Sequence, residues 1–324
     1  MLPLLMLGAA FSSPARSLLA ASAMPPRSPA IVMPEGPECR LHAETLHRRL
    51  QASSIRRASI LSGRYLGNGS VAGRRAPPER WDLLCSSLPA EILAIRITCA
   101  HHMLHAQLET SSAPTPHAQC KGKFIWWQLQ PETGQPAQLS FWSTLGMSGA
   151  WSPRRSPHSR VEFELTSASG ERSLLYFNDQ RNFGVLTVCD DSAILEAKLA
   201  SIGPSWLADE VPLSVFLEIA ERQTSNSRRA KVPLARFLMD QGKTAGIGNY
   251  LLSEALFKAG IYPWATCGDL EKSDWLTLHE AISTTIQASY DAQSARAIAA
   301  GKRSLKANAR SATFPEYLHT RAFS

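Results

Sequence analysis

The chain contains the stretch Met33-Pro34-Glu35-Gly36-Pro37-Glu38, in which a proline directly follows a methionine and carboxylates lie close by. If translation starts at Met33 and that methionine is removed, Pro34 carries a secondary amine that condenses with an aldehyde to a charged iminium. An α-amino group has a pKa near ~8, so part of it is neutral and reactive at physiological pH. Glu35 is then placed to move protons at the attacked carbon. On this stretch alone the simpler interpretation is favoured: Pro34 opens a helix, and Glu35 and Glu38 favour its positive end.

The residues from Pro37 to Leu50 have apolar side chains at helical spacing, with basic ones mostly facing away, which predicts one amphipathic helix. Short alternating apolar runs then continue to about residue 190, separated by Gly, Pro, Ser and Asn. This pattern predicts an antiparallel β-sandwich rather than βαβ units. The expected strands are Ile92–Thr98, Phe124–Leu129, Leu139–Trp142, Val161–Leu165, Leu174–Phe177 and Val185–Val188.

Helical periodicity follows from about residue 191, so the fold class is α+β. We expect a leader over 1–33, an N-terminal sandwich with a leading helix over 34–190, a helical domain over 191–300 and a tail over 301–324. The expected helices are Ala193–Leu199, Pro212–Glu221, Leu234–Asp240, Tyr250–Ala259 and Ser273–Tyr290.

Composition describes a globular protein of 324 residues and about two domains, with a net charge of +7 that favours a polyanionic partner. The six cysteines are scattered with no CxxC pair, which indicates neither a disulfide framework nor a cysteine-rich zinc site. A reducing compartment fits best. These cysteines are Cys39, Cys85, Cys99, Cys120, Cys189 and Cys267.

Residues 1–32 are rich in Leu, Ala, Ser and Pro and contain no acid, a composition typical of an organellar transit peptide. Its opening apolar run lacks a basic flank and is too short to span a bilayer. We therefore expect a transit peptide or a mis-called start rather than a secretion signal. Upstream sequence that is rarely translated is a third interpretation.

The stretch His101–Cys120 separates two expected strands and carries His101, His102 and His105 at metal-like spacing. Its flanking Thr, Ser and Pro favour a surface insertion, or a retained intron, over a metal site. No metal ligand is assigned.

Three short stretches of the N-terminal half have residue types suited to chemistry or binding. Cys120-Lys121-Gly122-Lys123-Phe124 places a lysine at the start of an apolar strand, where a solvated strand end is the simpler interpretation. Thr144-Leu145-Gly146-Met147-Ser148-Gly149 presents a methionine in a glycine-bracketed loop, suited to wedging between bases or to packing on the core. Asp179-Gln180-Arg181-Asn182-Phe183-Gly184 pairs a cation with an aromatic ring, suited to base stacking and phosphate contact, or to packing.

The helical half contains Gln241-Gly242-Lys243-Thr244-Ala245-Gly246-Ile247-Gly248-Asn249-Tyr250 between two expected helices. Gly246 and Gly248 allow close backbone approach, Lys243 adds charge, and Asn249 lies at a helix N-terminus that attracts phosphate. As a glycine motif this is weak, and an ordinary helix–turn–helix corner is the alternative.

Taken in order, these pieces resemble the Fpg/Nei family of bifunctional DNA glycosylases, from about residue 33 to 290. Each motif alone has low specificity for the family, but their combination in this order is highly specific. Gly36, where leucine also occurs in the family, favours the endonuclease VIII-like (Nei) branch and hence oxidised pyrimidines over 8-oxoguanine. The matching stretches are MPEGPE (33–38), KGKF (121–124), LGMSG (145–149), DQRNFG (179–184), IGP (202–204) and LMDQGKTAGIGNYLLSEAL (238–256).

The resemblance implies a chemical role for four residues. Pro34 attacks C1′ of the damaged nucleotide, expels the base and leaves a Schiff base, after which β,δ-elimination cuts the strand. Glu35 protonates the sugar ring oxygen and assists proton transfer. Lys123 contacts the phosphate and helps to position or protonate the lesion, and Glu38 supports the pocket.

The resemblance also implies how damaged double-stranded DNA is held. Met147, Arg181 and Phe183 fill the void that an extruded base leaves, and extrusion costs a few kcal/mol. Asn249 and the turn from Lys243 to Gly248 form a helix–two-turn–helix that grips phosphates, which predicts steep salt dependence. We expect a monomer without membrane association, in the nucleus or a DNA-containing organelle.

Three departures from the family pattern affect these expectations. The leader holds the Pro34 nitrogen in a peptide bond, so activity requires a start at Met33 or cleavage beside Pro34. The usual C-terminal zinc finger has no CxxC counterpart after residue 290, so no zinc is expected, and neither Arg310 nor Arg321 is assigned its DNA-binding role. Ser143-Thr144 stands where the family often has histidine.

Two other function classes stay open. A non-catalytic protein that binds lesions or abasic sites predicts DNA binding without covalent trapping. An RNA-binding module is the third hypothesis, because a similar helix–two-turn–helix occurs in a ribosomal protein, but it gives Pro34-Glu35, Lys123 and Met147 no role.

Overall fold

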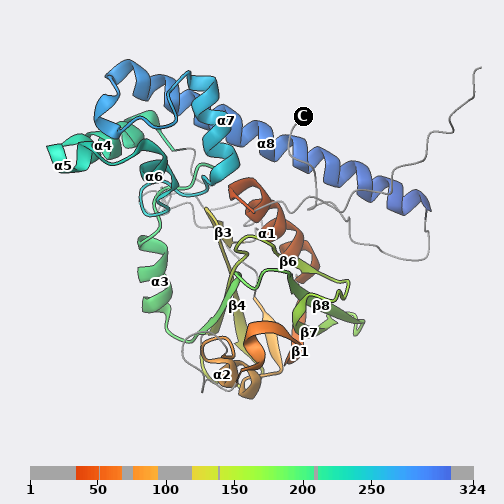
Figure 1. Ribbon diagram of the computed structural model, residues 1–324. Helices are drawn as coiled ribbons and strands as arrows, with labels where there is room; N and C mark the ends of the chain where they lie inside the picture. Colours follow the sequence, from red (N-terminus) through yellow and green to blue (C-terminus); the bar gives the residue numbers. More distant parts are fainter. Residues whose placement is uncertain are drawn as a thin grey trace, which may run out of the picture.

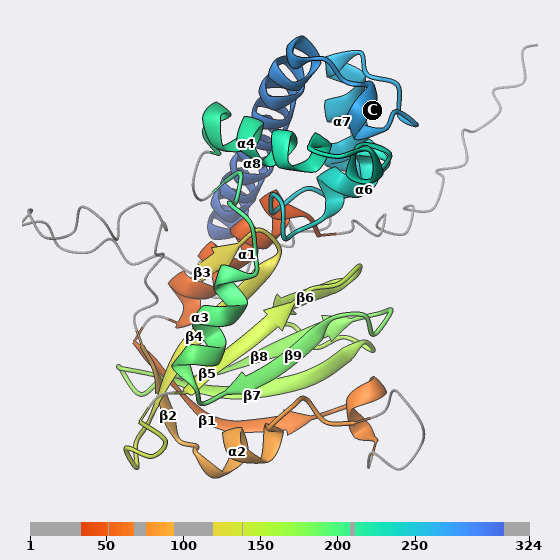
Figure 2. The ribbon, with the colours of Figure 1, turned by 90° about the vertical axis from the view of Figure 1, so that its left-hand side faces the viewer.

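The computed structural model shows a β-rich part, which the chain leaves at helix α3, followed by a helical part (Figure 1). The helix α1, Gly36–Leu50, lies between the sheet and α8, Lys272–Ala307 (Figures 1 and 2). The structure describes residues 34–50, 52–67, 76–93, 119–137, 139–207 and 211–307, with side chains described as far as residue 299.

The β-rich part is one nine-stranded antiparallel sheet in the order β6-β8-β7-β1-β2-β4-β5-β9, with β3 pairing β4. Among the described residues its end strands, β6 and β9, do not pair with each other, so the sheet is open. The strands are β1 (Ser53–Ile60), β2 (Ala90–Ile92), β3 (Gln119–Lys121), β4 (Phe124–Pro131), β5 (Leu139–Thr144), β6 (Gly149–Ser152), β7 (Ser159–Ser167), β8 (Arg172–Asp179) and β9 (Val185–Cys189).

The sheet folds over so that strands far apart in this order pack their side chains together. Ring centroids of Trp127 on β4 and Trp151 on β6 lie 5.4 Å apart, and those of Phe141 on β5 and Phe163 on β7 lie 5.2 Å apart. Such edge-to-face pairs add stability beyond the apolar area that they bury. The predicted sandwich is therefore confirmed, with both of its layers belonging to one continuous sheet.

The leading helix was predicted from apolar spacing, and α1 buries the residues that this spacing selected. Three strands were not predicted: β1 has two adjacent arginines that interrupt its alternation, and β3 and β6 are only three and four residues long. The strand expected over Ile92–Thr98 shares only Ile92 with β2, and its residues 94–98 lie outside the described residues. The short helices η1 (Gly63–Leu66) and α2 (Trp81–Ser86) were also missed. Their length gives too few residues for a helical period to emerge.

The helical part has its own core around Phe216, Leu234, Phe237, Leu251 and Trp275. Its helices are α3 (Ser192–Ala200), α4 (Leu213–Thr224), α5 (Ser227–Ala230), α6 (Leu234–Met239), α7 (Asn249–Ala259), the short η2 (Cys267–Asp269) and α8. Helices α6 and α7, with the turn between them, form the expected helix–two-turn–helix.

The last helix is longer than predicted. We expected it to end at Tyr290, but α8 continues to Ala307 and so takes in the first residues of the expected tail. The apolar period fades after Tyr290, whereas alanine-rich residues without proline still favour a helix. Residues 308–324 lie outside the described residues.

The stretch proposed as a surface insertion lies mostly outside the described residues, including its three histidines. Its last two residues, Gln119 and Cys120, instead begin β3 and pair with Trp126 and Ile125. None of the helices in the described part of the chain has the length and apolar character needed to cross a membrane.

Candidate active site

The expected DNA-contacting residues of the β-rich part gather at one end of three adjacent strands. Phe124 on β4 pairs with Thr144 on β5, which pairs in turn with Val185 on β9. Lys123 directly precedes the first of these residues, the Met147 loop follows the second, and Phe183 lies two residues before the third. Strand register therefore brings three motifs, separated by up to sixty residues, to one edge of the sheet.

The Glu35 side chain is buried, with 1% of its surface exposed, and caps the N-terminus of α7. Its carboxylate accepts backbone N–H bonds from Gly248 (2.9 Å), Tyr250 (2.9 Å) and Leu251 (3.2 Å). Burial raises the pKa of Glu35 to about 7, although Lys123 and the α7 N–H groups act in the opposite direction. At neutral pH this carboxyl is therefore divided between its acid and base forms and can move a proton either way.

Gly248 is the point at which Glu35 and Lys123 converge. A Cβ built on Gly248 would collide with the Glu35 carboxyl group and with Nζ of Lys123. The φ angle of Gly248 is −135°, in the extended region that any residue can adopt. Glycine is therefore required here for space, because the two functional side chains occupy the volume of a methyl group.

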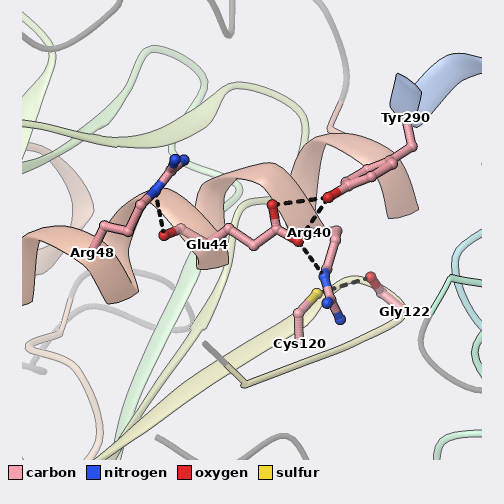
Figure 3. Close-up of polar contacts among 6 residues, drawn as sticks. All are labelled: Arg40, Glu44, Arg48, Cys120, Gly122 and Tyr290. Atoms are coloured by element: carbon pink, nitrogen blue, oxygen red, sulfur yellow. Dashed lines mark hydrogen bonds and ion pairs between the residues drawn. The ribbon is translucent and has the colours of Figure 1, made fainter. Parts of the chain in front are cut away.

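The turn that carries Lys123 is fixed by its neighbours on both sides. Nζ of Lys121 donates to the carbonyl of Leu199 at the end of α3 (2.9 Å), and the Gly122 N–H donates to Oγ of Ser205 (3.2 Å). Sγ of Cys120 donates to the Gly122 carbonyl (3.4 Å; Figure 3). Burial raises the pKa of Cys120 to about 12, so this thiol stays protonated and serves packing rather than nucleophilic chemistry.

Glu38 is also buried and joins three helices. Its carboxylate accepts the backbone N–H of Glu35 (2.9 Å), the hydroxyl of Tyr250 on α7 (2.9 Å) and Nε2 of Gln293 on α8 (2.5 Å). The bond to the Glu35 N–H holds the peptide unit that links Pro34 to Glu35. Pro34 is itself buried and directly precedes Glu35 in the chain.

The helix–two-turn–helix meets the start of α1 through glycines. The Gly36 N–H donates to the Gly246 carbonyl (2.8 Å), and a Cβ on Gly36 would lie 3.0 Å from Gly246 Cα. Gly246 has a φ of +118°, which disfavours any side chain at that position. Gly36 therefore also allows the start of α1 to lie close to this turn, in addition to the lesion preference that the resemblance implies for it.

The turn between α6 and α7 is held by the Gln241 side chain. Its amide donates to the Ile247 carbonyl (2.9 Å), and its carbonyl oxygen accepts the Gly246 N–H (2.9 Å). Lys243 and Asn249 are exposed on this turn. We expected free N–H groups for phosphate at the start of α7, but Glu35 takes those of Tyr250 and Leu251, which leaves the Asn249 and Lys243 side chains as the candidate phosphate contacts.

The loop that carries Met147 and the loop that carries Arg181 and Phe183, together called the rim loops below, contact each other. Nη1 of Arg181 donates to Sδ of Met147 (3.6 Å), and the Arg181 N–H donates to Oγ of Ser148 (2.9 Å). Asp179 is buried and binds the Ser148 hydroxyl and the Gly184 N–H. The Phe183 ring remains 55% exposed, which leaves its face available for stacking.

Sequence reasoning missed the residues that hold these groups in place. Tyr250 and Gln293 bind Glu38, and Asp179 and Arg160 brace the rim loop, where Nε of Arg160 donates to the Asp179 carbonyl (2.7 Å). Asp179 was visible as part of the DQRNFG stretch, but Gln293 lay beyond the predicted end of its helix. Within the described residues, no group of three or more His, Cys, Asp or Glu side chains is arranged to hold a metal ion.

Two family models match this chain in the order of its two parts. The model described as "Formamidopyrimidine-DNA glycosylase N-terminal domain" matches residues 97–186, and "Formamidopyrimidine-DNA glycosylase H2TH domain" matches residues 207–300. Together they span more than half of the chain. The chain belongs to the Fpg/Nei family. Its expected fold, an antiparallel sandwich followed by a helix–two-turn–helix, is confirmed as the fold of that family.

The relatives within the Fpg/Nei family are named formamidopyrimidine-DNA glycosylases. The protein of Parafrankia sp. (strain EAN1pec) is 35% identical over 178 residues, which cover 53% of this chain and 58% of the relative. That of Deinococcus radiodurans is 32% identical over 158 residues, which cover 48% of this chain and 51% of the relative. The chain thus spans a little over half the length of the curated relatives that it matches.

Solved Fpg structures share the fold at lower sequence identity. Fpg (MutM) of Thermus thermophilus superposes with a TM-score of 0.55 at 21% identity, over 80% of this chain and 76% of that chain. Lactococcus lactis Fpg, in a non-covalent complex with DNA containing an abasic (AP) site, superposes with a TM-score of 0.57 at 18% identity, over 79% and 82% of the two chains.

Proposed function

We propose that this chain is a DNA glycosylase with AP lyase activity that excises oxidised bases from duplex DNA through a Schiff base to Pro34. The observation that carries the proposal is the state of Glu35. A buried carboxyl with a pKa of about 7 lies beside Lys123 and next in the chain to Pro34, at the edge where the rim loops gather. Oxidised pyrimidines are the favoured lesions in this proposal.

The proposed reaction uses the neutral Pro34 amine as nucleophile. Glu35 gives its proton to the ring oxygen as the Pro34 nitrogen bonds to C1′ and the C1′–O4′ bond opens. The Pro34 nitrogen then returns its own proton to Glu35, which passes it to the base as the bond from C1′ to the base breaks and the iminium forms. Removal of a C2′ proton expels the 3′ phosphate, and a second elimination expels the 5′ phosphate.

The proposed reaction requires that the Pro34 nitrogen be a free N-terminal amine. In the 324-residue chain the Pro34 nitrogen is bonded to Met33, and an amide nitrogen has no free electron pair with which to attack C1′. The reactive form must therefore begin at Pro34.

Borohydride trapping on a duplex with one abasic site tests this function. A chain beginning at Pro34 is expected to form a covalent adduct, and the 324-residue chain is expected to form none. Base release from thymine glycol and 8-oxoguanine duplexes by the Pro34-first chain then measures lesion preference, with thymine glycol expected to react faster.

The other outcomes separate the competing hypotheses. DNA binding without an adduct from either chain would indicate a non-catalytic lesion-binding protein. Adducts from both chains would indicate an internal lysine as the nucleophile and would overturn the role of Pro34. Faster release of 8-oxoguanine would overturn the pyrimidine preference alone.

Met147→Ala is expected to weaken binding to a duplex with an abasic-site analogue by roughly tenfold, because a side chain that fills the void of an extruded base is lost. Binding to undamaged duplex should change little, since no base is extruded there. Fluorescence anisotropy on both duplexes measures the difference. Met239→Ala, which removes an exposed methionine of α6, is the matched control, and equal losses on both duplexes would contradict the wedge assignment.

A further inference from the structure

Tyr250 contacts both buried carboxylates of the candidate site. Its backbone N–H donates to Oε1 of Glu35 (2.9 Å), and its hydroxyl lies 2.9 and 3.1 Å from the two carboxylate oxygens of Glu38. The same hydroxyl lies 3.0 Å from Oγ of Ser289 on α8. A single residue in the first turn of α7 thus touches both buried acids, Glu35 and Glu38.

Glu38 receives a matching contact from α8. Nε2 of Gln293 donates to Oε1 of Glu38 (2.5 Å) and to Oγ of Ser289 (3.0 Å). Tyr250 and Gln293 therefore hold the Glu38 carboxylate from two different helices. Glu38 in turn accepts the Glu35 N–H (2.9 Å), which sets the orientation of the peptide unit between Pro34 and Glu35.

A second bridge one turn and a half further along α1 fixes the same pair of helices. The Tyr290 hydroxyl on α8 lies 2.8 and 2.9 Å from the carboxylate oxygens of Glu44, which also accepts Nε of Arg40 at 2.7 Å (Figure 3). Helix α1 is thus already tied to α8 without the contacts to Glu38. The Tyr250 hydroxyl is therefore free to serve the local geometry of Glu38 rather than the docking of the helix as a whole.

We propose that Tyr250 is a positioning residue which, through Glu38, orients the Pro34–Glu35 peptide unit for attack on C1′. The inference rests on the proposed function. Hydrogen bonds from a neutral donor to a carboxylate are among the stronger ones in proteins, and they are directional. Burial raises the pKa of the Tyr250 hydroxyl well above its ordinary value, so this group stays protonated and remains a donor at every working pH.

Tyr250→Phe in the Pro34-first chain tests the inference, because it removes the hydroxyl and keeps the ring. The trapping rate at saturating enzyme should fall by about 10- to 100-fold, as expected for a misplaced reacting group. The Kd for a duplex with a tetrahydrofuran abasic analogue should change by less than roughly threefold, because no DNA-facing group is removed. Tyr262→Phe, which changes an exposed tyrosine of the same part of the chain, is the matched control and should behave as wild type.

A double-mutant cycle with Glu38→Gln distinguishes positioning from a general structural role. If Tyr250 acts through Glu38, Tyr250→Phe should add little to the rate loss of Glu38→Gln. Additive losses, or an unchanged trapping rate in Tyr250→Phe, would overturn the inference. A loss of DNA affinity as large as the loss of rate would also overturn it.

The same assays separate this inference from the function on which it rests. If the wild-type Pro34-first chain forms no adduct, the proposed function fails. If that chain forms an adduct and Tyr250→Phe forms it at the same rate, only the positioning role fails.

Discussion

Replacing Glu35 by glutamine is expected to abolish base release in the Pro34-first chain, with a loss on the order of 10²- to 10⁴-fold, the usual contribution of a positioned acid–base group. The buried carboxyl accepts three backbone N–H bonds from the start of α7 and has a pKa of about 7. Glutamine has nearly the same shape and retains one acceptor oxygen, but it cannot donate and recover a proton. Binding to lesion duplex should therefore persist.

The pH dependence of the wild-type rate follows from two groups: the Pro34 amine must be deprotonated, whereas the Glu35 carboxyl must be protonated. The neutral amine becomes more abundant up to pH ~8, and the protonated Glu35 becomes less abundant above about 7. The rate should therefore rise below pH ~7, stay level to pH ~8 and fall above it. In Glu35→Gln the falling limb should disappear, because no titrating acid remains and only the amine shapes the profile.

Single-turnover base release between pH 5.5 and 9.5, at roughly half-unit steps, measures both effects. Glu164→Gln is the matched control, because it neutralises a half-exposed carboxylate of the same sheet and should leave the rate unchanged. Wild-type rates for Glu35→Gln, or an unchanged falling limb, would show that another group carries the proton.

The sequence predicted those helices and strands in which apolar side chains recur with a regular period over several residues. The apolar spacing of α1 follows from burial of one face, and the later residues of β4, β5 and β7 alternate between buried and partly buried, whereas the first three or four residues of each strand are all buried. Strand β1 was missed because Arg56 and Arg57 adjoin each other, where its burial alternation is interrupted. The far end of α8 was missed because helical propensity, rather than an apolar stripe, continues it.

In the candidate site, the contacts between residues far apart in the chain could not be predicted from the sequence. Glu35, Lys123 and Met147 were selected through their motifs, and their roles stay predictions. The capping of α7 by Glu35 joins residues 213 to 216 positions apart, and no local pattern contains it. Tyr250 was quoted within its motif without a role, because only tertiary contact shows that its hydroxyl reaches Glu38.

Gly248→Ala is expected to reduce trapping and base release by at least ~100-fold, because displacement of reacting groups by about 1 Å has effects of that size. The added methyl group would collide with the Glu35 carboxyl group and with Nζ of Lys123. Lys123 can swing aside on its flexible stem, but Glu35 is buried and bound by three N–H groups, so it must lose some of these bonds. Single-turnover assays in the Pro34-first chain measure the loss.

The backbone of Gly248 makes this substitution a test of the site rather than of the fold. Its φ of −135° suits alanine, so the chain should fold and melt near the wild-type temperature. Gly242→Ala, in the same turn, is the matched control, because a Cβ there meets only Asp240 Oδ1 at 3.2 Å and the Ser201 carbonyl at 3.4 Å. Equal rates for Gly248→Ala and Gly242→Ala would show that the space shared by Glu35 and Lys123 is not what requires glycine at position 248. They would also show that proton transfer by Glu35 does not depend on its hydrogen bonds to the start of α7.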